Sequence, residues 1–370
     1  TPNTSATIEN NSYTVELEES EKEQVVCTKL NGTSKIICSE PLIAKEPTAS
    51  EVILASKTID NSRSGAITGV LTTNGNGKLY SVADDYGTSY VYAGNVTDNW
   101  VKWAGFYWRI IRINGDGSLR LIYNGTSTAA TGEGTQIRTS AFNTNANDNA
   151  YVGYMYGSAG ASSYSATHTN TTNSIIKGIL DNWYKTNIED KNYSKDVSTE
   201  QGFCNDRRIA SSSETFWYID TKRGYGTNTT AYAPFSRILN TDGNWDSTQT
   251  PTLKCNQTND YFTVSGSSKG NHKLTYPVGL ITSDEVVLAG GFGGTANQSY
   301  YLYTGQVYWT MSPSYFNGNN ALVFIVYNDG YLNYRSVNNE YGVRPVINLK
   351  ANVQITAGNG TSNSPYVVEG

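Results

Sequence analysis

The sequence predicts an α+β fold in which short strands and long loops outnumber helices. Apolar residues at helical spacing mark only two clear segments, whereas short apolar runs bounded by Gly and Asn recur through most of the chain. With 370 residues, of which 38% are hydrophobic and 12% aromatic, the chain can bury a large core. We therefore expect a large domain with two main helices, short mixed or antiparallel strands and long loops, plus a small N-terminal β appendage.

Three regions are expected along the chain. Residues 1–45 contain an alternating run and a hairpin with an Asn-Gly turn, but they are too few to build an independent core. We predict a small β hairpin or stalk region there. Residues 48–350 are expected to form the main, ligand-binding domain, in which residues 126–172 are read as long surface loops. Residues 351–370 are predicted to be a C-terminal strand or tail.

The clearest strand pair lies early in the main domain. Residues 106–113 and 118–123 are rich in aromatic and β-branched side chains, and they flank a Gly-rich turn. This pattern predicts an antiparallel pair. Shorter strands are expected towards the C-terminus, at residues 307–311, 322–327, 331–333 and 343–349.

The two helices have separate signals. Residues 175–184 place Ile, Leu, Trp and Tyr on one face, after a possible cap at Ser174 or the Asn before it. A second helix is expected to begin at Thr282, which forms a capping box with Glu285. The glycine-rich run 290–294 is read as the stop of this helix and a flexible loop.

The four cysteines form two well-separated couples. Cys27 and Cys38 flank the hairpin turn, where a cross-strand disulfide is geometrically reasonable. A disulfide between Cys204 and Cys255 would close a long loop without predictable secondary structure. Four free buried thiols are the alternative. Paired cysteines favour an oxidising compartment, and because the chain starts without Met we expect that a signal peptide or anchor has been removed.

Composition excludes several function classes. The net charge is −5 and the basic residues are scattered, so no binding of nucleic acid is expected. No apolar run approaches the roughly 20 residues of a membrane span, so membrane attachment is expected only through a missing N-terminal anchor. His168 and His272 are the only histidines, and both are read as solvated loop residues. We expect no catalytic residue, no metal and no cofactor.

Residues 312–341 carry the strongest functional signal. Apolar residues recur there at positions that can face inward, while Asn and Tyr recur around them. Tyr offers rigid amphipathic contact area and Asn offers adaptable hydrogen bonds, the combination found in antibody paratopes. Adenine-directed mutation of Asn codons never reaches Lys, Glu, Gln, Met or Trp, and none of these occurs in residues 312–339. An ordinary Asn- and Tyr-rich surface segment explains the same pattern about equally well.

Four stretches of the chain resemble the variable proteins of bacterial diversity-generating retroelements. The stretches are residues 103–117 (WAGFYWRIIRINGDG), 202–207 (GFCNDR), 274–286 (LTYPVGLITSDEV) and 341–350 (YGVRPVINLK). The resemblance covers residues 50–350 and implies a C-type-lectin-like fold of the formylglycine-generating-enzyme type. The segment from Trp309 to Pro345 is similar to the variable region of that family, although Thr310 and Met311 stand where the family more often has Leu-Arg.

The resemblance divides this segment into a constant frame and a displayed set. The frame would be Trp309, Pro313, Phe324, Val326, Gly330, Leu332, Val337, Gly342, Val343, Arg344 and Pro345. The displayed, ligand-binding set would be Ser314, Tyr315, Asn317, Asn319, Asn320, Ile325, Tyr327, Asn328, Tyr331, Asn333, Tyr334, Ser336, Asn338, Asn339 and Tyr341.

The resemblance implies a non-catalytic bacterial protein, secreted or displayed at the cell surface, with a diversified recognition face. Its partner would be a protein or a glycan. Two alternatives stay open. One is an oxidase or metal enzyme on the same fold, similar to the formylglycine-generating enzymes, and the other is a calcium-independent glycan-binding lectin or adhesin.

Overall fold

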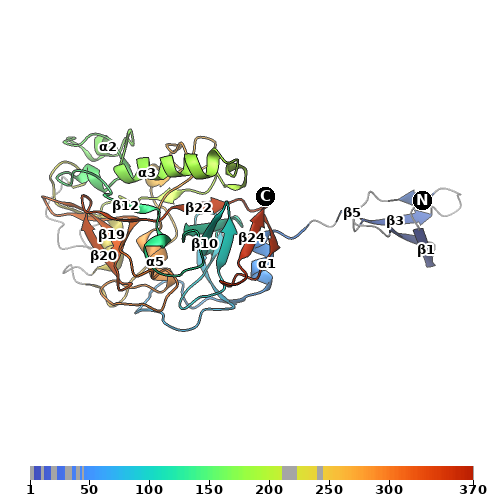
Figure 1. Ribbon diagram of the computed structural model, residues 1–370. Helices are drawn as coiled ribbons and strands as arrows, with labels where there is room; N and C mark the ends of the chain where they lie inside the picture. The colour runs from blue at the N-terminus through green and yellow to red at the C-terminus, as the bar shows by residue number, and fades with distance from the viewer. Residues whose placement is uncertain are drawn as a thin grey trace. The chain divides into compact units, whose positions relative to one another are not determined.

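The chain divides into two compact units, Thr1–Pro47 and Thr48–Gly370. The computed structural model describes residues 46–210, 223–239 and 245–369, together with the backbone of five strands in the first 45 residues. Both units are described separately below (Figure 1). The fold is α+β, with more residues in strands than in helices, as the sequence predicts.

The N-terminal unit is one antiparallel sheet. Its strands are β1 (Thr4–Glu9), β2 (Ser12–Leu17), β3 (Glu23–Lys29), β4 (Ile36–Cys38) and β5 (Leu42–Ile43), with β5 pairing with β3. The predicted hairpin is present as β3 and β4, and its register places Cys27 opposite Cys38. The side chains of both cysteines, and therefore the predicted disulfide between them, lie outside the described residues.

A nine-stranded sheet forms one side of the larger unit. Its strands are β6 (Thr58–Asp60), β7 (Lys78–Ala83), β8 (Thr88–Val91), β9 (Trp100–Trp103), β10 (Phe106–Ile113), β11 (Leu119–Tyr123), β22 (Val346–Leu349), β23 (Gln354–Ala357) and β24 (Tyr366–Glu369). The predicted pair is confirmed as β10 and β11, which run antiparallel. The C-terminal residues join this sheet, because β24 lies parallel to β9.

A six-stranded sheet forms the other side. Its strands are β12 (Arg138–Ser140), β16 (Thr230–Ala231), β18 (Tyr308–Phe316), β19 (Ala321–Val326), β20 (Leu332–Ser336) and β21 (Tyr341–Val343). Two short pairs complete the strands, β13 (Met155–Tyr156) with β14 (Thr172–Asn173) and β15 (Phe203–Cys204) with β17 (Tyr261–Phe262). The predicted strand 343–349 is divided into β21 and β22, which belong to different sheets.

Both predicted helices are confirmed, and three further helices were not predicted. The helices are α1 (Ala49–Ala55), α2 (Tyr164–Thr167), α3 (Ile175–Tyr184), α4 (Ala233–Ile238) and α5 (Ser283–Ala289). Ser174 caps α3, and the Thr282–Glu285 capping box begins α5. Gly290, with φ +117°, ends α5 in the left-handed conformation that favours glycine. Further single turns are η1 (Glu133–Thr135), η2 (Asn149–Val152), η3 (Lys185–Glu189), η4 (Ser194–Asp196) and η5 (Thr258–Asp260).

The core of the larger unit lies around α5. Every residue of α5 is buried, and Figure 1 shows the helix between the strands of the two sheets, with α3 running along one side of both. α5 contacts β18, β19 and β20, while Glu285 reaches Arg112 of β10 and Arg120 of β11. One helix therefore joins the two sheets. Among the described residues, no helix combines the length and apolarity that crossing a membrane would need.

Residues 126–172 are not simply surface loops. Phe142, Val152 and Tyr154 in this stretch have no exposed surface, and η2 packs against β18 and β19. The prediction of a solvated His168 was also wrong. Its ring stacks on Tyr164 at 3.8 Å, and burial together with a nearby Arg lowers its pKa to about 2, so it stays neutral. Residues 126–172 were read as surface loops because most of them are polar. The few apolar side chains that anchor the region to the core were too widely spaced to form a pattern.

Candidate functional site

The candidate site is built on β18, β19 and β20. These strands pair antiparallel in sequence order, with β19 in the middle and β20 at the edge of the six-stranded sheet. The predicted frame is confirmed as buried. It comprises Trp309, Pro313, Phe324, Val326, Gly330, Leu332, Val337, Gly342, Val343, Arg344 and Pro345.

The predicted displayed residues differ in exposure. Exposed side chains are Asn317, Asn319, Asn328, Asn338 and Asn339. Half-buried ones are Tyr315, Asn320, Tyr327, Tyr331, Tyr334, Ser336 and Tyr341. Buried ones are Ser314, Ile325 and Asn333. The fully exposed side chains of the segment therefore lie in its turns, whereas its tyrosines are partly buried against the core.

Ser314 and Ile325 are corrections to the predicted set, because both have 0% exposed surface. Ile325 lies in β19, where all six residues are buried, so both faces of this strand are covered. Ser314 lies in the part of β18 that is covered by β16, and its carbonyl accepts a hydrogen bond from the Tyr232 N–H at 3.0 Å. Neither side chain can meet a ligand without unfolding the sheet.

Tyr341 lies apart from the other tyrosines. It begins β21, which β18 and β19 separate from β20, so roughly 14 Å of sheet lies between the two strands. Its ring packs against Trp309, with 5.2 Å between ring centroids. Tyr341 is therefore not part of the cluster around β20.

Amide and hydroxyl groups gather at one end of the β18–β20 strands. This amide rim consists of Asn317, Asn319, Asn320, Ser336, Asn338 and Asn339. The Asn317 side chain accepts the N–H groups of Asn319 and Asn320 at 3.0 and 2.7 Å, which shapes the turn between β18 and β19. The Ser336 hydroxyl donates to Asn338 at 2.8 Å. These hydrogen bonds fix two adjacent turns whose amides meet solvent.

An aromatic face continues from this rim along β20. It consists of Trp245, Tyr315, Tyr327, Tyr331, Tyr334 and Arg335. Tyr334 lies 5.1 Å from Tyr315 and 5.7 Å from Trp245 between ring centroids, and Trp245 also contacts Tyr331 at 6.4 Å. Successive residues of a strand point to opposite faces, so Tyr334 and Arg335 diverge. Tyr315 and Tyr334 form one pair of rings, and Tyr327 and Tyr331 form another. Trp245 contacts both pairs and links them into one cluster.

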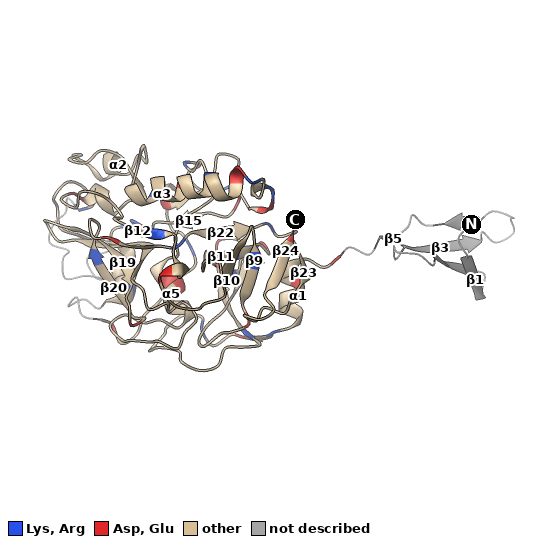
Figure 2. Cartoon of the chain, in the orientation of Figure 1, with Lys and Arg blue, Asp and Glu red and all other residues tan. Residues whose placement is uncertain are grey.

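The charged side chains on and beside the aromatic face make local contacts. The Arg335 guanidinium lies 5.2 Å from the Tyr327 ring centroid and donates to the Tyr334 carbonyl at 2.8 Å. Burial raises the pKa of Tyr315 and Tyr331, so both phenols stay protonated at neutral pH and can donate hydrogen bonds. The Asp329 carboxylate accepts the Tyr331 N–H at 3.3 Å. In Figure 2 most of the ribbon around β19 and β20 is uncharged.

Trp245 was missed by the sequence interpretation, because it lies far from residues 312–341. Its ring packs on the glycine-rich run after α5. A Cβ atom on Gly293 or on Gly294, which has φ +75°, would collide with that ring. The glycine run is thus more than a helix stop, since the absence of side chains leaves the space that Trp245 fills.

The outer backbone edge of β20 is covered. The Leu332 N–H donates to the Phe292 carbonyl at 3.0 Å, and the Tyr334 N–H donates to the Asn333 side chain at 2.8 Å. The Tyr334 carbonyl accepts from Arg335, as described above. Three of the polar backbone groups that an edge strand normally offers to another strand are therefore occupied.

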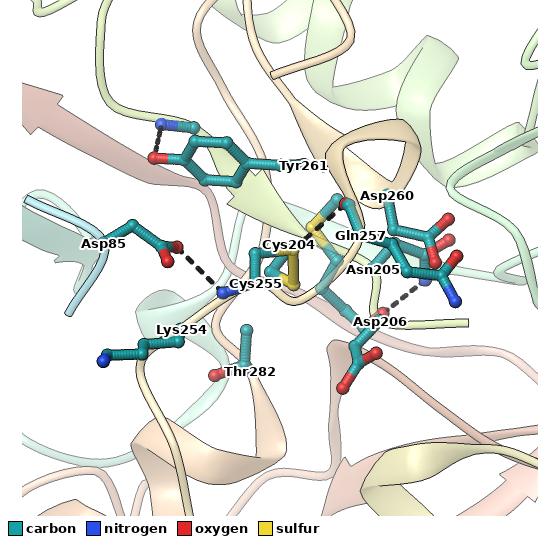
Figure 3. Close-up of a disulfide and its surroundings, with 12 residues drawn as sticks. Asp85, Cys204, Asn205, Asp206, Lys254, Cys255, Gln257, Asp260, Tyr261 and Thr282 are labelled. Carbon is teal, nitrogen blue, oxygen red and sulfur yellow. Dashed lines mark hydrogen bonds between the residues drawn. A yellow bond between two sulfur atoms is a disulfide. The ribbon is translucent and has the colours of Figure 1, made fainter. Parts of the chain in front are cut away.

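A second polar region surrounds the predicted disulfide between Cys204 and Cys255, which is confirmed (Figure 3). The Asp85 carboxylate accepts the Cys255 N–H at 2.8 Å, and the Tyr261 hydroxyl accepts the Gly202 N–H at 2.8 Å. The disulfide lines a crevice with a cavity of about 30 Å³. A void of this size holds about one water molecule.

Ion pairs occupy the floor of this crevice. Glu285 bonds Arg112 at 3.2 Å and Arg120 at 2.5 Å, while Arg237 bonds Asp206 at 2.8 Å. Burial disfavours the ionised Glu285, but the attraction of Arg120 and Arg112 outweighs burial and lowers its pKa. Because these charged side chains pair with one another, we interpret the network as structural. Its ion pairs connect α5 to the nine-stranded sheet. Among the described residues, no group of three or more His, Cys, Asp or Glu side chains is arranged to hold a metal ion.

Comparisons with known proteins bear on one part of the chain. No curated protein and no solved structure matches it significantly. Residues 197–351 match the model of a family described as "Domain of unknown function (DUF6273)". The matched part carries Cys204, Trp245 and all of β18, β19 and β20, so it includes the aromatic face and the amide rim, whereas Asp85, Arg112 and Arg120 of the crevice lie outside it.

Proposed function

We propose that the protein is a non-catalytic bacterial ligand-binding protein, secreted or displayed at the cell surface. Its ligand would meet the aromatic face and the amide rim, and this surface would be diversified by a retroelement on a C-type-lectin-like scaffold. The observation that carries the proposal is the separation within one segment between a buried frame and a partly exposed set of Tyr and Asn side chains.

The physical argument concerns which positions tolerate change. Substitution at exposed positions usually changes the free energy of unfolding by less than about 0.5 kcal/mol, whereas buried positions are sensitive to a single methylene. The frame residues of β19 and β20 hold the backbone in place, while the turns that carry Asn317, Asn328 and Asn338 project from it. Sequence can therefore vary at the turns while the scaffold stays the same.

The test is to sequence this locus across related strains. Substitutions should concentrate in the amide rim and at Tyr315, Tyr327, Tyr331 and Tyr334 of the aromatic face. They should be absent from Trp309, Ile325 and Leu332. A near-copy of the segment beside a reverse transcriptase gene is the expected source of the variation. Substitutions spread evenly through residues 48–370 would contradict the proposal.

An oxidase or metal enzyme on the same fold is the second candidate. The observation in its favour is the polar crevice that the Cys204–Cys255 disulfide lines. Metal analysis of the purified protein, before and after reduction of the disulfide, tests it. Stoichiometric copper or iron would favour the enzyme, whereas substoichiometric traces in both samples would count against it.

A further inference from the structure

The edge of β20 restricts the kind of ligand that the proposed recognition surface can take. Extended peptides commonly bind a sheet by adding a strand to an open edge, where main-chain hydrogen bonds provide the affinity. Here the Leu332 N–H, the Tyr334 N–H and the Tyr334 carbonyl already have partners. A peptide would have to displace Asn333 and Arg335 before it could pair. Strand addition is therefore disfavoured at this edge.

The exposed groups provide a different chemistry. Half-buried rings of Tyr and Trp present apolar surface beside a polar hydroxyl or N–H. Each exposed Asn has two N–H donors and one acceptor carbonyl in a single plane. The carbonyls of Asn317 and Asn338 already accept hydrogen bonds within their turns, so these two residues chiefly offer donors. Sugar rings have complementary groups, because their C–H faces pack on aromatic rings and their neighbouring hydroxyls both donate and accept hydrogen bonds. The surface combines these two kinds of group over the ends of β18 and β19, the strand β20, the turns between them and Trp245.

The charge of the surface further restricts the class of ligand that it can bind. Only three of the thirty residues 312–341 are charged, namely Asp329, Arg335 and Glu340. Arg335 lies over Tyr327 and bonds the Tyr334 carbonyl, and Asp329 bonds the Tyr331 N–H. The one cation of the aromatic face is thus held by internal contacts. Arg335 and Asp329 together carry no net charge, so we expect only a weak attraction of strongly charged ligands to the aromatic face.

We propose that this surface binds a neutral glycan, with sugar rings packed on the Trp245 and Tyr334 side of the aromatic face and hydroxyls bonded to the amide rim. This inference rests on the proposed function and names its ligand class. Trp245 belongs to the binding set although it lies outside residues 312–341. Calcium sites in proteins usually combine several carboxylates. Because residues 312–341 carry only the carboxylates of Asp329 and Glu340, we expect binding without calcium.

The experiment is an array of neutral and acidic oligosaccharides probed with the full chain, in calcium-free buffer with chelator. Calorimetry of the best neutral oligosaccharide should then compare the wild type with Trp245→Ala, Tyr334→Ala and Tyr107→Ala. Tyr107 is a matched control, because it is a half-buried tyrosine on β10 in the other sheet. We expect about a tenfold or greater loss of affinity for Trp245→Ala and Tyr334→Ala, as for aromatic anchors in other interfaces, and no change for Tyr107→Ala.

Trp245→Ala could disturb the packing on the glycine run, so Asn339→Ala, an exposed substitution in the amide rim, provides a second test. It should weaken binding without lowering the melting temperature. The inference is overturned if no neutral glycan binds, if only acidic glycans bind, or if Tyr107→Ala weakens binding as much as Tyr334→Ala. None of these results bears on the distribution of substitutions at the locus, so the proposed function is tested independently.

Discussion

Replacing Ile325 by Ser tests whether this position belongs to the frame. The side chain has 0% exposed surface in the central strand β19. Loss of a buried aliphatic side chain costs about 2–5 kcal/mol, and an unpaired buried hydroxyl adds about 1–3 kcal/mol. We expect the free energy of unfolding to fall by about 4 kcal/mol. For a unit of this size, that corresponds to a melting temperature lower by roughly 6 °C.

Urea unfolding followed by tryptophan fluorescence measures this change. Asn328→Ser is the matched control, since it introduces the same residue in the exposed turn next to β19. The control should stay within about 0.5 kcal/mol of the wild type. If Ile325→Ser lost less than about 1 kcal/mol, the assignment of this position to a sealed frame would be refuted. An equal loss in both variants would refute the distinction between strand and turn.

Three further changes test the scaffold by equilibrium unfolding. Replacing both Cys204 and Cys255 by Ser should cost about 4 kcal/mol, because the disulfide spans 51 residues; a loss below 1 kcal/mol would contradict this. Thr48→Ala should cost about 1 kcal/mol by removing the cap of α1, and an unchanged midpoint would show that the cap is dispensable. Asp84→Asn should cost about 1–3 kcal/mol at pH 7. Burial opposes ionisation of Asp84, but bonds from Gly115, Ser89 and Arg112 lower its pKa below the usual 3.8. The ionised carboxylate therefore stabilises the fold above pH 3.8, and the difference between variant and wild type should shrink as the pH falls further; a difference that stays constant would contradict the assignment.

Sequence patterns predicted the long helix and the main strand pair, because each has a local signal. The ten residues of α3 give a clear periodicity, and α5 has both a capping box and a glycine stop. Helix α1 was missed although Thr48 and Glu51 form a capping box that could have been read from the sequence. Helices α2 and α4 have four and six residues, too few to show a period, so tertiary packing rather than local propensity stabilises them.

The candidate site was predictable only in part. The continuous apolar run of β19 is the pattern of a strand buried on both faces, so the inward position of Ile325 could have been inferred. The displayed set instead assumed that inward and outward residues alternate along this strand, which is the pattern of a strand with one solvated face. Trp245 had no such signal, because it joins the aromatic face through a contact between distant parts of the chain. The glycine run at 290–294 was the single sequence feature that indicated this contact, because a side chain that packs closely on the backbone often requires glycine there.

The edge position of β20 also decides which residues are free to vary. Asn333 and Arg335 cover the N–H and the carbonyl of Tyr334, so their side chains protect the open edge against pairing with another chain. A small apolar residue at either position would expose these backbone groups. Asn338 and Asn339 do not cover the Tyr334 backbone, because they lie in an exposed turn. A recognition surface on an edge strand therefore needs constant residues of its own, and Asn333 is better placed in that constant group than in the displayed set.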